Sequence, residues 1–208
     1  MIRLYDNVKL PLSSKFSRNK FNLLIASKHL RFFSAYKKAQ KSLLVGGTSN
    51  HLRPRSLTMV LEAMKLNSQS TFVDLGSSLG LPCILASLTF DLPEAQCRGI
   101  EWSPLLVAAA RALAKEANLS INYTCADIGK LDHEDLRGVT HLYSFDAVFL
   151  PDTFKHIKFF IDLCTTLKTF ASAHSPTHWP KWSLQNQVRV RMGCSGQAFT
   201  IYVYTRYA

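Results

Sequence analysis

One stretch of this chain, residues 71–102, restricts the possible folds more than any other. It starts with an apolar run that leads to Asp74, breaks at Gly76 and Gly80, continues as an apolar segment of helix length, and closes with a second apolar run that ends on Glu101. Short, continuously apolar runs are typical of parallel strands that are buried on both faces. The stretch therefore predicts a strand, a glycine turn, a helix and a second strand in an α/β fold.

Four residues of this stretch predict a nucleotide site at the carboxyl end of the sheet. Gly76 and Gly80 permit positive φ angles and allow a ligand to approach the backbone closely. Asp74 is expected where its strand meets solvent, and Glu101, at the tip of the next strand, is placed to accept hydrogen bonds from both hydroxyls of a ribose. The spacing excludes a P-loop and differs from a G-x-G-x-x-G dinucleotide site. An ordinary strand–turn–helix of an unrelated α/β protein stays open as an alternative.

The order D-x-G-x-S-x-G resembles motif I of the class I S-adenosylmethionine-dependent methyltransferases, with Asp74, Gly76 and Gly80 in register. Ser78 is a departure, because a middle glycine is usual at its position. The resemblance implies a Rossmann-like sheet of seven strands with a C-terminal antiparallel hairpin. It also implies S-adenosyl-L-methionine as the cofactor, with Glu101 at its ribose.

Residues after the second and third strands are candidates for the adenine side of this site. Trp102 can stack on an adenine ring or can be ordinary packing, and the sequence leaves both open. Asp127, with Ile128 after it, follows the predicted strand at 121–125, where this fold holds the adenine amino group. A carboxylate or its neighbouring backbone can accept from that amino group. A helix N-cap is the alternative role for Asp127.

The remaining segments continue the alternation and end in two strand-like runs around a glycine-containing turn, which predicts a hairpin. Ser103 and Pro104 are a natural N-cap and first residue for the helix that follows Glu101. Helices are predicted at 53–67, 104–118 and 155–170, and further strands at 121–125, 143–150, 187–192 and 198–205.

With these elements in order, residues 52–204 resemble the disruptor-of-telomeric-silencing family, which methylates nucleosomal histone lysines without a SET domain. The resemblance rests on FVDLGSSLG, on GIEW at the ribose-binding strand end, on CADI near the adenine, and on the closing AFTIYVYTRY. It implies a histone-type lysine N-methyltransferase that acts on chromatin. By analogy, the basic segment that precedes the fold would contact nucleosomal DNA.

The segment after the fourth strand departs from the family, which carries an Asn-Asn-Phe-type motif there. This chain has Leu150, Pro151, Asp152 and then Phe154, and these residues are expected to line the methyl-transfer site. Phe154 can wall a lysine channel, and Asp152 can orient the amine or can be a helix N-cap. The family's tyrosine–glycine–glutamate loop is also absent, with 48–51 in roughly its place.

The net charge of +11 is carried by the first quarter of the chain. Residues 1–55 hold twelve Lys or Arg and one acid, Asp6, whereas the rest holds thirteen of each sign. The sequence therefore divides into a basic, mainly helical N-terminal segment, 1–50, and a methyltransferase domain, 51–208. Three interpretations of the amphipathic part, 14–44, stay open: a helical face packed on the core, an arm that contacts nucleic acid or the nucleosome, and a mitochondrial transit or membrane-surface helix. Nucleic acid is expected to bind through residues 14–55.

The five cysteines are scattered through apolar runs, which favours reduced thiols in an intracellular compartment and no zinc site. His174 and His178 have metal-like spacing, but Pro176 between them would break the helix that such a pair needs. No apolar run is long enough to predict a transmembrane helix. The nucleus is the favoured location, with the mitochondrion as the alternative.

Two classes of function therefore compete. The first is methyl transfer to a lysine of a basic, histone-type protein. The second is a methyltransferase fold without catalysis that binds RNA or a ribonucleoprotein, such as a mitochondrial ribosome-associated factor, as Ser78 and Pro151 would allow. A nucleic-acid methyltransferase is a third possibility, but the segment at 150–153 matches an Asn-Pro-Pro-aromatic motif poorly.

Overall fold

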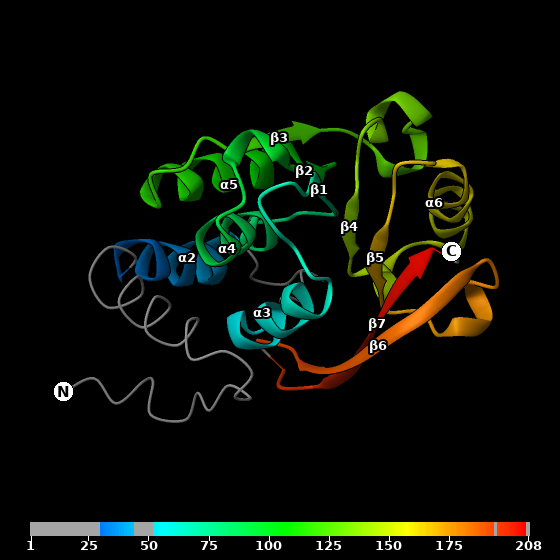
Figure 1. Cartoon of the computed structure of the whole chain (residues 1–208). Coiled ribbons are helices and arrows are strands. Elements are labelled where there is room, and N and C mark those ends of the chain that lie inside the picture. Colours follow the sequence, from blue (N-terminus) through cyan, green and yellow to red (C-terminus); the bar gives the residue numbers. More distant parts are fainter. Residues whose placement is uncertain (1–29, 44–51, 194, 207–208) are drawn as a thin grey trace.

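The chain folds around one mixed sheet of seven strands in the order β3-β2-β1-β4-β5-β7-β6, with helices on both faces (Figure 1). The structure is a computed structural model, and it describes residues 30–43, 52–193 and 195–206. The strands β1 to β5 are mutually parallel, whereas β7 pairs antiparallel with both β5 and β6. The strands are β1 (Phe72–Leu75), β2 (Cys97–Glu101), β3 (Asn122–Cys125), β4 (His141–Ser144), β5 (Thr169–Ser172), β6 (Trp182–Arg191) and β7 (Ala198–Arg206).

Alternate strand residues supply two hydrophobic cores, one on each face of the sheet. Phe72 of β1 belongs to the first core, and its neighbour Val73 belongs to the second. The first core is covered by four helices and the second by α6, as Figure 1 shows for the two sides of the sheet. The helices are α2 (Leu30–Leu43), α3 (Pro54–Ala63), α4 (Leu81–Phe90), α5 (Pro104–Glu116) and α6 (Pro151–Leu163). Short 3-10 turns complete the chain: η1 (Glu94–Gln96), η2 (Ile128–Lys130), η3 (His133–Leu136), η4 (Asp146–Val148) and η5 (Pro176–His178).

The predicted α/β fold and C-terminal hairpin are confirmed, and so are the predicted helix cap at Ser103 and the glycine turn. Ser103 caps α5 by accepting a hydrogen bond from the amide of Leu106, and Pro104 begins the helix. Gly80 precedes α4 in the left-handed region, at φ +74°. The glycine turn therefore ends where the helix starts, as the sequence predicted.

The prediction was wrong between β4 and β5. The fourth strand ends at Ser144 and not at residue 150, because the chain turns into η4 directly after Phe145. The helix predicted at 155–170 ends at Leu163, and residues 169–172, of which the last two were assigned to no element, form β5. All four residues of β5 are buried, so the strand lacks the alternation that would have distinguished it from the helix before it.

The described part of the basic segment is α2, which is packed on the core. Its Phe32 and Tyr36 are buried in the first core, and α2 lies against α5. Lys37 and Lys38 on the same helix are exposed. Residues 14–29, the family-loop position at 48–51 and the boundary at residue 50 lie outside the described residues, so the division into two segments stays a prediction.

Two further findings concern the described residues alone. None of their helices combines the length and the apolar character that crossing a membrane would require. No group of three or more metal-ligating side chains gathers within them.

Candidate functional site

The glycine turn after β1 folds back onto the end of β2. The amides of Gly76 and Ser77 both donate to the carbonyl of Ile100, at 2.9 and 3.0 Å. The next amide, that of Ser78, donates to Oε2 of Glu101 at 2.9 Å, and the amide of Ser103 donates to Oε1 at 3.0 Å. Each carboxylate oxygen of Glu101 is thus held by one amide and keeps a further acceptor position, which is what a pair of ribose hydroxyls requires.

Tyr123 of β3 supports the glycine turn, a role that no sequence motif indicated. Its hydroxyl donates to the carbonyl of Gly80 at 2.9 Å, and the residue is 1% exposed. A Cβ atom on Gly80 would lie 2.3 Å from that hydroxyl, and one on Gly99 of β2 would lie 2.4 Å from the same ring. Both glycines are therefore required by the close approach of this tyrosine.

Asp74 lies in the sheet beneath the turn and is not at the solvent edge where the sequence placed it. It is the third of four residues in β1 and is 1% exposed. Burial raises the pKa of its carboxyl well above the usual range, and the nearby charge of Glu101 raises that pKa further. Within the part of the chain that the structure describes, its Oδ2 has no hydrogen-bond partner, and neither has Oγ of the nearby Ser77. A buried carboxylate without a cation or donor is costly, so these atoms fit a ligand that brings a positively charged amine.

The residues predicted for the adenine side divide into one buried and two exposed positions. Ile128 is buried in the second core. Asp127 accepts from the amide of Gly129 at 2.9 Å and caps η2, which is the alternative role considered for it. Trp102 is 74% exposed directly after Glu101, so it is not a core residue and its ring is open to a ligand. The adenine contact itself stays a prediction for all three.

Phe149 brings the segment after β4 onto the glycine turn. A Cβ atom on Gly76 would meet its ring at 3.1 Å and would lie 3.9 Å from the side chain of Ile128. Leu150 and Pro151, which follow it at the start of α6, are exposed. The carboxyl ends of β1 and β4 are therefore joined through one aromatic ring, at the point where open α/β sheets bind ligands.

The two predicted catalytic residues have different surroundings. Asp152 is 96% exposed at its side chain and pairs with Lys155 on the outside of α6, so it is not brought to the strand ends. Phe154 packs on the second core and contacts the ring of His174 in a tilted arrangement, with ring centroids 3.9 Å apart. The carboxylate at the end of β4 is instead Asp146, which is 1% exposed and which the sequence analysis missed.

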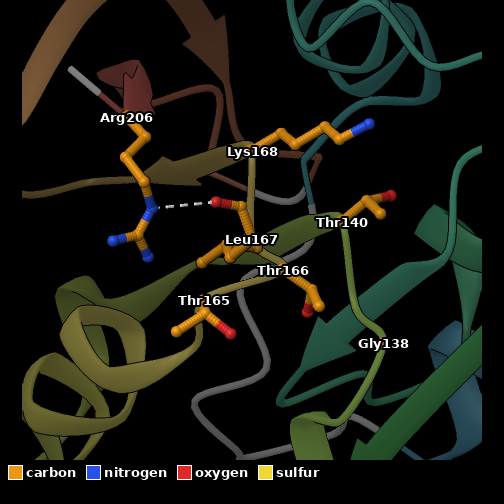
Figure 2. A pocket seen from close by; sticks show the side chains of 7 residues that line it. All are labelled: Gly138, Thr140, Thr165, Thr166, Leu167, Lys168 and Arg206. Carbon is orange, nitrogen blue, oxygen red and sulfur yellow. Dashed lines mark hydrogen bonds between the residues drawn. The ribbon is translucent and has the colours of Figure 1, made fainter. Parts of the chain in front are cut away.

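A separate cavity lies at the opposite end of the sheet, near the amino ends of β4 and β5 (Figure 2). It has a volume of about 520 Å³ and is open to solvent. Arg206 donates there to the carbonyl of Leu167 at 3.3 Å, as the dashed line in Figure 2 shows. No candidate site residue lines it; the lining is Gly138, Thr140, Thr165, Thr166, Leu167, Lys168 and Arg206.

Comparison with known proteins agrees with this geometry. The family model described as "Histone methylation protein DOT1" matches residues 34–138, which is half of the chain. That match spans the segment from α2 through the turn, Glu101 and Asp127. No curated protein matches the sequence.

Several solved structures share the fold. An RNA methyltransferase from Salinibacter ruber, in complex with S-adenosyl-L-homocysteine, has a TM-score of 0.56 and 22% identity, over 72% of this chain and 89% of that one. Magnesium protoporphyrin IX methyltransferase from Synechocystis, with bound S-adenosylmethionine, has a TM-score of 0.59 and 13% identity, over 94% and 92%. TrmN from Thermus thermophilus has a TM-score of 0.60 and 16% identity, over 86% and 53%. The sheet order, the turn held by Glu101 and the family match lead to one conclusion: this chain belongs to the DOT1 family of histone methylation proteins and is an S-adenosylmethionine-dependent methyltransferase of the class I fold.

Proposed function

We propose that the chain transfers a methyl group from S-adenosylmethionine to a lysine side chain of a basic, histone-type protein. The observation that carries this proposal is the pair of buried carboxylates at the glycine turn. Glu101 has both oxygens fixed by amides, and one oxygen of Asp74 has no hydrogen-bond partner among the described residues. The membership of the DOT1 family supports lysine as the acceptor.

Each residue of the site has a distinct task in this proposal. S-adenosylmethionine, when bound, supplies a methyl group activated by a sulfonium. Glu101 would accept from the ribose hydroxyls, and Asp74 would hold the cationic amine of the methionyl part. Phe149, over Gly76, would exclude water from the region between the cofactor and the acceptor. Trp102 would cover the adenine.

Methyl transfer depends more on how the protein aligns the two reactants than on an acid or base that it supplies. Displacement at a methyl carbon needs a neutral amine in line with the sulfur, and holding two reactants in line is worth about 7–11 kcal/mol when it is complete. Phe149, which lies between β4 and α6, approaches the glycine turn from the acceptor side. The exposed lysines of α2, Lys37 and Lys38, support a partner with a polyanionic surface such as chromatin.

A direct test combines cofactor binding with methyl transfer. Calorimetry with the full chain is expected to give a micromolar dissociation constant for S-adenosylmethionine. Labelled methyl groups are expected on histone lysines of reconstituted nucleosomes, and this labelling should disappear in Asp74→Ala and Glu101→Ala. Glu116→Ala, which removes an exposed acid from α5, is the matched control and should retain both signals. Labelling that persists in the first two variants would remove these carboxylates from the site.

RNA is the second candidate partner, and the concentration of positive charge in residues 1–55 favours it. Binding of a labelled transfer or ribosomal RNA through that charge would depend steeply on salt concentration, and an RNA acceptor would take up the labelled methyl group. Running the same assay with RNA in place of nucleosomes separates the two. Methyl transfer to RNA would replace lysine as the acceptor while keeping the cofactor site.

A further inference from the structure

Positive charge is segregated within the part of the chain whose charges cancel overall. Residues 56–162 hold eight Lys or Arg and thirteen acids, whereas residues 163–208 hold five Lys or Arg and no acid. Those five are Lys168, Lys181, Arg189, Arg191 and Arg206. The C-terminal part of the chain, which contains β5, β6 and β7, is therefore a second basic region, separate from the first quarter.

Two of these arginines lie on one face of β6. Arg189 and Arg191 are exposed, while the valines on either side of Arg189 belong to the first core. Because side chains alternate along a strand, both arginines lie on the opposite face of the sheet. Their cross-strand neighbours on β7 are Thr200 and Ala198, so no acid of that strand faces them.

Arg53 reaches the same place from the segment before α3. Leu52 and Met192 form an antiparallel bridge, and the amide of Arg53 donates to the carbonyl of Arg191 at 2.9 Å. Arg53 and Arg191 are therefore directly opposite one another, and both are exposed. Nε of Arg53 also donates to the carbonyl of Met192 at 3.3 Å, which holds its guanidinium beside the hairpin. Arg53, Arg189 and Arg191 are called the arginine patch below.

The arginine patch is unfavourable for the chain by itself. Like charges directly opposite one another on neighbouring strands are destabilising. Within the described part of the chain, none of the three arginines forms an ion pair that would offset this repulsion. Guanidinium groups carry donors and no acceptor, so they cannot satisfy one another. Three cations held together without a counter-charge therefore point to an anionic ligand from outside the chain.

The arginine patch projects beyond the sheet at the cofactor edge. Ser172, the last residue of β5, pairs with Tyr202 of β7, and Tyr202 pairs with Gln187 of β6. Since β6 runs parallel to β5, the residues from Gln187 to Arg191 continue past the carboxyl end of β5 by about 13 Å. Figure 1 shows this end of the hairpin beside α3. A ligand on the patch would therefore lie at the same edge of the sheet as the glycine turn.

The arrangement of the patch suits the backbone of a duplex. Its residues follow a protruding strand end, and about 7 Å separates the Cα atoms of Arg189 and Arg191 along the strand. Guanidinium groups match phosphate oxygens in a bidentate manner. Single-stranded nucleic acids also need aromatic rings on which their bases stack, and the neighbours Thr200 and Ala198 offer none. A row of phosphates on a double helix meets these requirements.

We propose that Arg53, Arg189 and Arg191 bind the phosphate backbone of double-stranded DNA beside the methyl-transfer site. The choice of DNA over RNA rests on the proposed function, because a histone-type acceptor is bound to DNA. A backbone contact positions the duplex without selecting a base sequence. Arg189 and Arg191 also lie outside residues 14–55, for which the sequence predicted nucleic-acid binding.

The test measures DNA binding by fluorescence anisotropy, with the full chain, a short labelled duplex and a range of KCl concentrations. The test variant is Arg189→Gln/Arg191→Gln, which changes two exposed side chains. The matched control is Lys115→Gln/Arg137→Gln, which removes the same charge from exposed positions on α5 and after η3. Each protein is measured with two unrelated DNA sequences and with an RNA duplex of the first sequence.

The dissociation constant for DNA is expected to rise about tenfold in the test variant, and equally for both sequences. The slope of its logarithm against the logarithm of the salt concentration should fall by about 1.8, because two phosphate contacts are lost. The control should leave both quantities unchanged. The thermal midpoint of the test variant should not fall, since Arg191→Gln removes the repulsion from Arg53.

An unchanged slope, an equal loss in the control, a loss limited to one sequence, a lower thermal midpoint or tighter binding of the RNA duplex would overturn the proposal. Methyl labelling of nucleosomal histones keeps this outcome apart from the proposed function. If histone lysines are labelled and the slope does not change, the DNA site is wrong and the proposed function stands. If the slope falls and no histone lysine is labelled, the proposed function is wrong and the DNA site stands.

Discussion

The amide of Ser78 donates to Oε2 of Glu101 at 2.9 Å, which ties the glycine turn after β1 to the end of β2. The residue that departs from the usual glycine pattern is therefore the one whose backbone orients the ribose carboxylate. Ser78 has a φ of +47°, in the left-handed region that a glycine would adopt without strain. The departure thus keeps the turn's conformation and leaves the geometry of the site intact.

Replacing Glu101 by glutamine is expected to weaken both the fold and cofactor binding. A glutamine has one oxygen and one NH2 group, so one of the two amides, of Ser78 or Ser103, would face another donor. An unsatisfied buried donor lowers the free energy of unfolding by about 1–3 kcal/mol. The loss of the charge should weaken the binding of S-adenosylmethionine about tenfold or more. Urea unfolding and calorimetry measure the two effects. Glu116→Gln, on the surface of α5, is the control and should change neither.

Ser78→Gly should be tolerated, because glycine removes the left-handed strain of about 1 kcal/mol while it increases the flexibility of the unfolded chain by a similar amount. The thermal midpoint is expected to change by only a few degrees, with the cofactor affinity within about threefold. Ser78→Val, which places a β-branched residue at the same φ, should cost clearly more. A large loss of affinity in Ser78→Gly would show that the hydroxyl itself contacts the cofactor.

The glycines at 80 and 138 form a matched pair, with φ values of +74° and +73°. A Cβ atom on Gly80 would clash with the hydroxyl of Tyr123, whereas one on Gly138 would have nothing within 4 Å. Gly138→Ala should therefore cost about 1 kcal/mol for backbone strain, and Gly80→Ala about 2 kcal/mol or more beyond that for overpacking. Denaturant unfolding of the two variants isolates the contribution of Tyr123. Equal losses would mean that the ring yields without cost.

The comparison of sequence and structure shows which signals are local. The turn, Glu101 and the start of α5 at Ser103 and Pro104 depend on residues near one another in the chain, and the sequence predicted them. The end of β4 was misplaced because the run from 145 to 150 is apolar apart from Asp146. Those apolar residues pack on distant partners, since Phe145 contacts Phe199 and Phe149 contacts Gly76.

The site predicted from the sequence was also incomplete, because some of its residues depend on contacts with distant parts of the chain. Tyr123 reads as an ordinary strand residue, and its role depends on the pairing of β2 with β3, which places it beneath the turn. In the sequence, Asp146 reads as an interior residue of a long strand. In the structure it lies in η4, where its carboxylate accepts a hydrogen bond from Ser172. His174 and His178 were considered only as metal ligands, whereas their rings pack against Phe154, the first tilted and the second edge-on.

His141, at the start of β4, is expected to make the fold sensitive to acid. Burial, followed by the charge of Lys168, lowers the pKa of its imidazole from 6.5 to about 4. The unfolded chain therefore binds a proton at a higher pH than the folded chain does. The free energy of unfolding is therefore unaffected by this group above pH 6.5. It falls by about 1–3 kcal/mol as the pH is lowered toward 4. His141→Gln should show less loss between pH 7 and pH 4.5 than the parent in urea unfolding. Parallel curves for the two proteins would contradict this.

Asp74 is expected to stabilise the bound cofactor at the expense of the fold. Its folded-state pKa is raised by burial first and by Glu101 second, so the folded chain holds the proton of Asp74 more tightly than the unfolded chain does. As the pH rises above the usual value of 3.8, the unfolded chain loses this proton first, and the fold becomes less stable relative to acid. Asp74→Asn keeps the shape and removes the ionisation. It should therefore unfold at a higher urea concentration than the parent at pH 7, with the difference shrinking toward pH 4.

The same substitution should weaken the binding of S-adenosylmethionine about tenfold or more, because the side chain that pairs with its cationic amine has lost its charge. Such opposite effects on stability and binding identify a group whose role is to bind the ligand. Replacing a carboxylate with a structural role would instead lower the stability and the cofactor affinity together. Glu116→Gln changes the net charge by the same amount at an exposed position and should shift neither quantity. If Asp74→Asn bound the cofactor as tightly as the parent, the unpaired Oδ2 would have another purpose, and Glu101 alone would anchor the site.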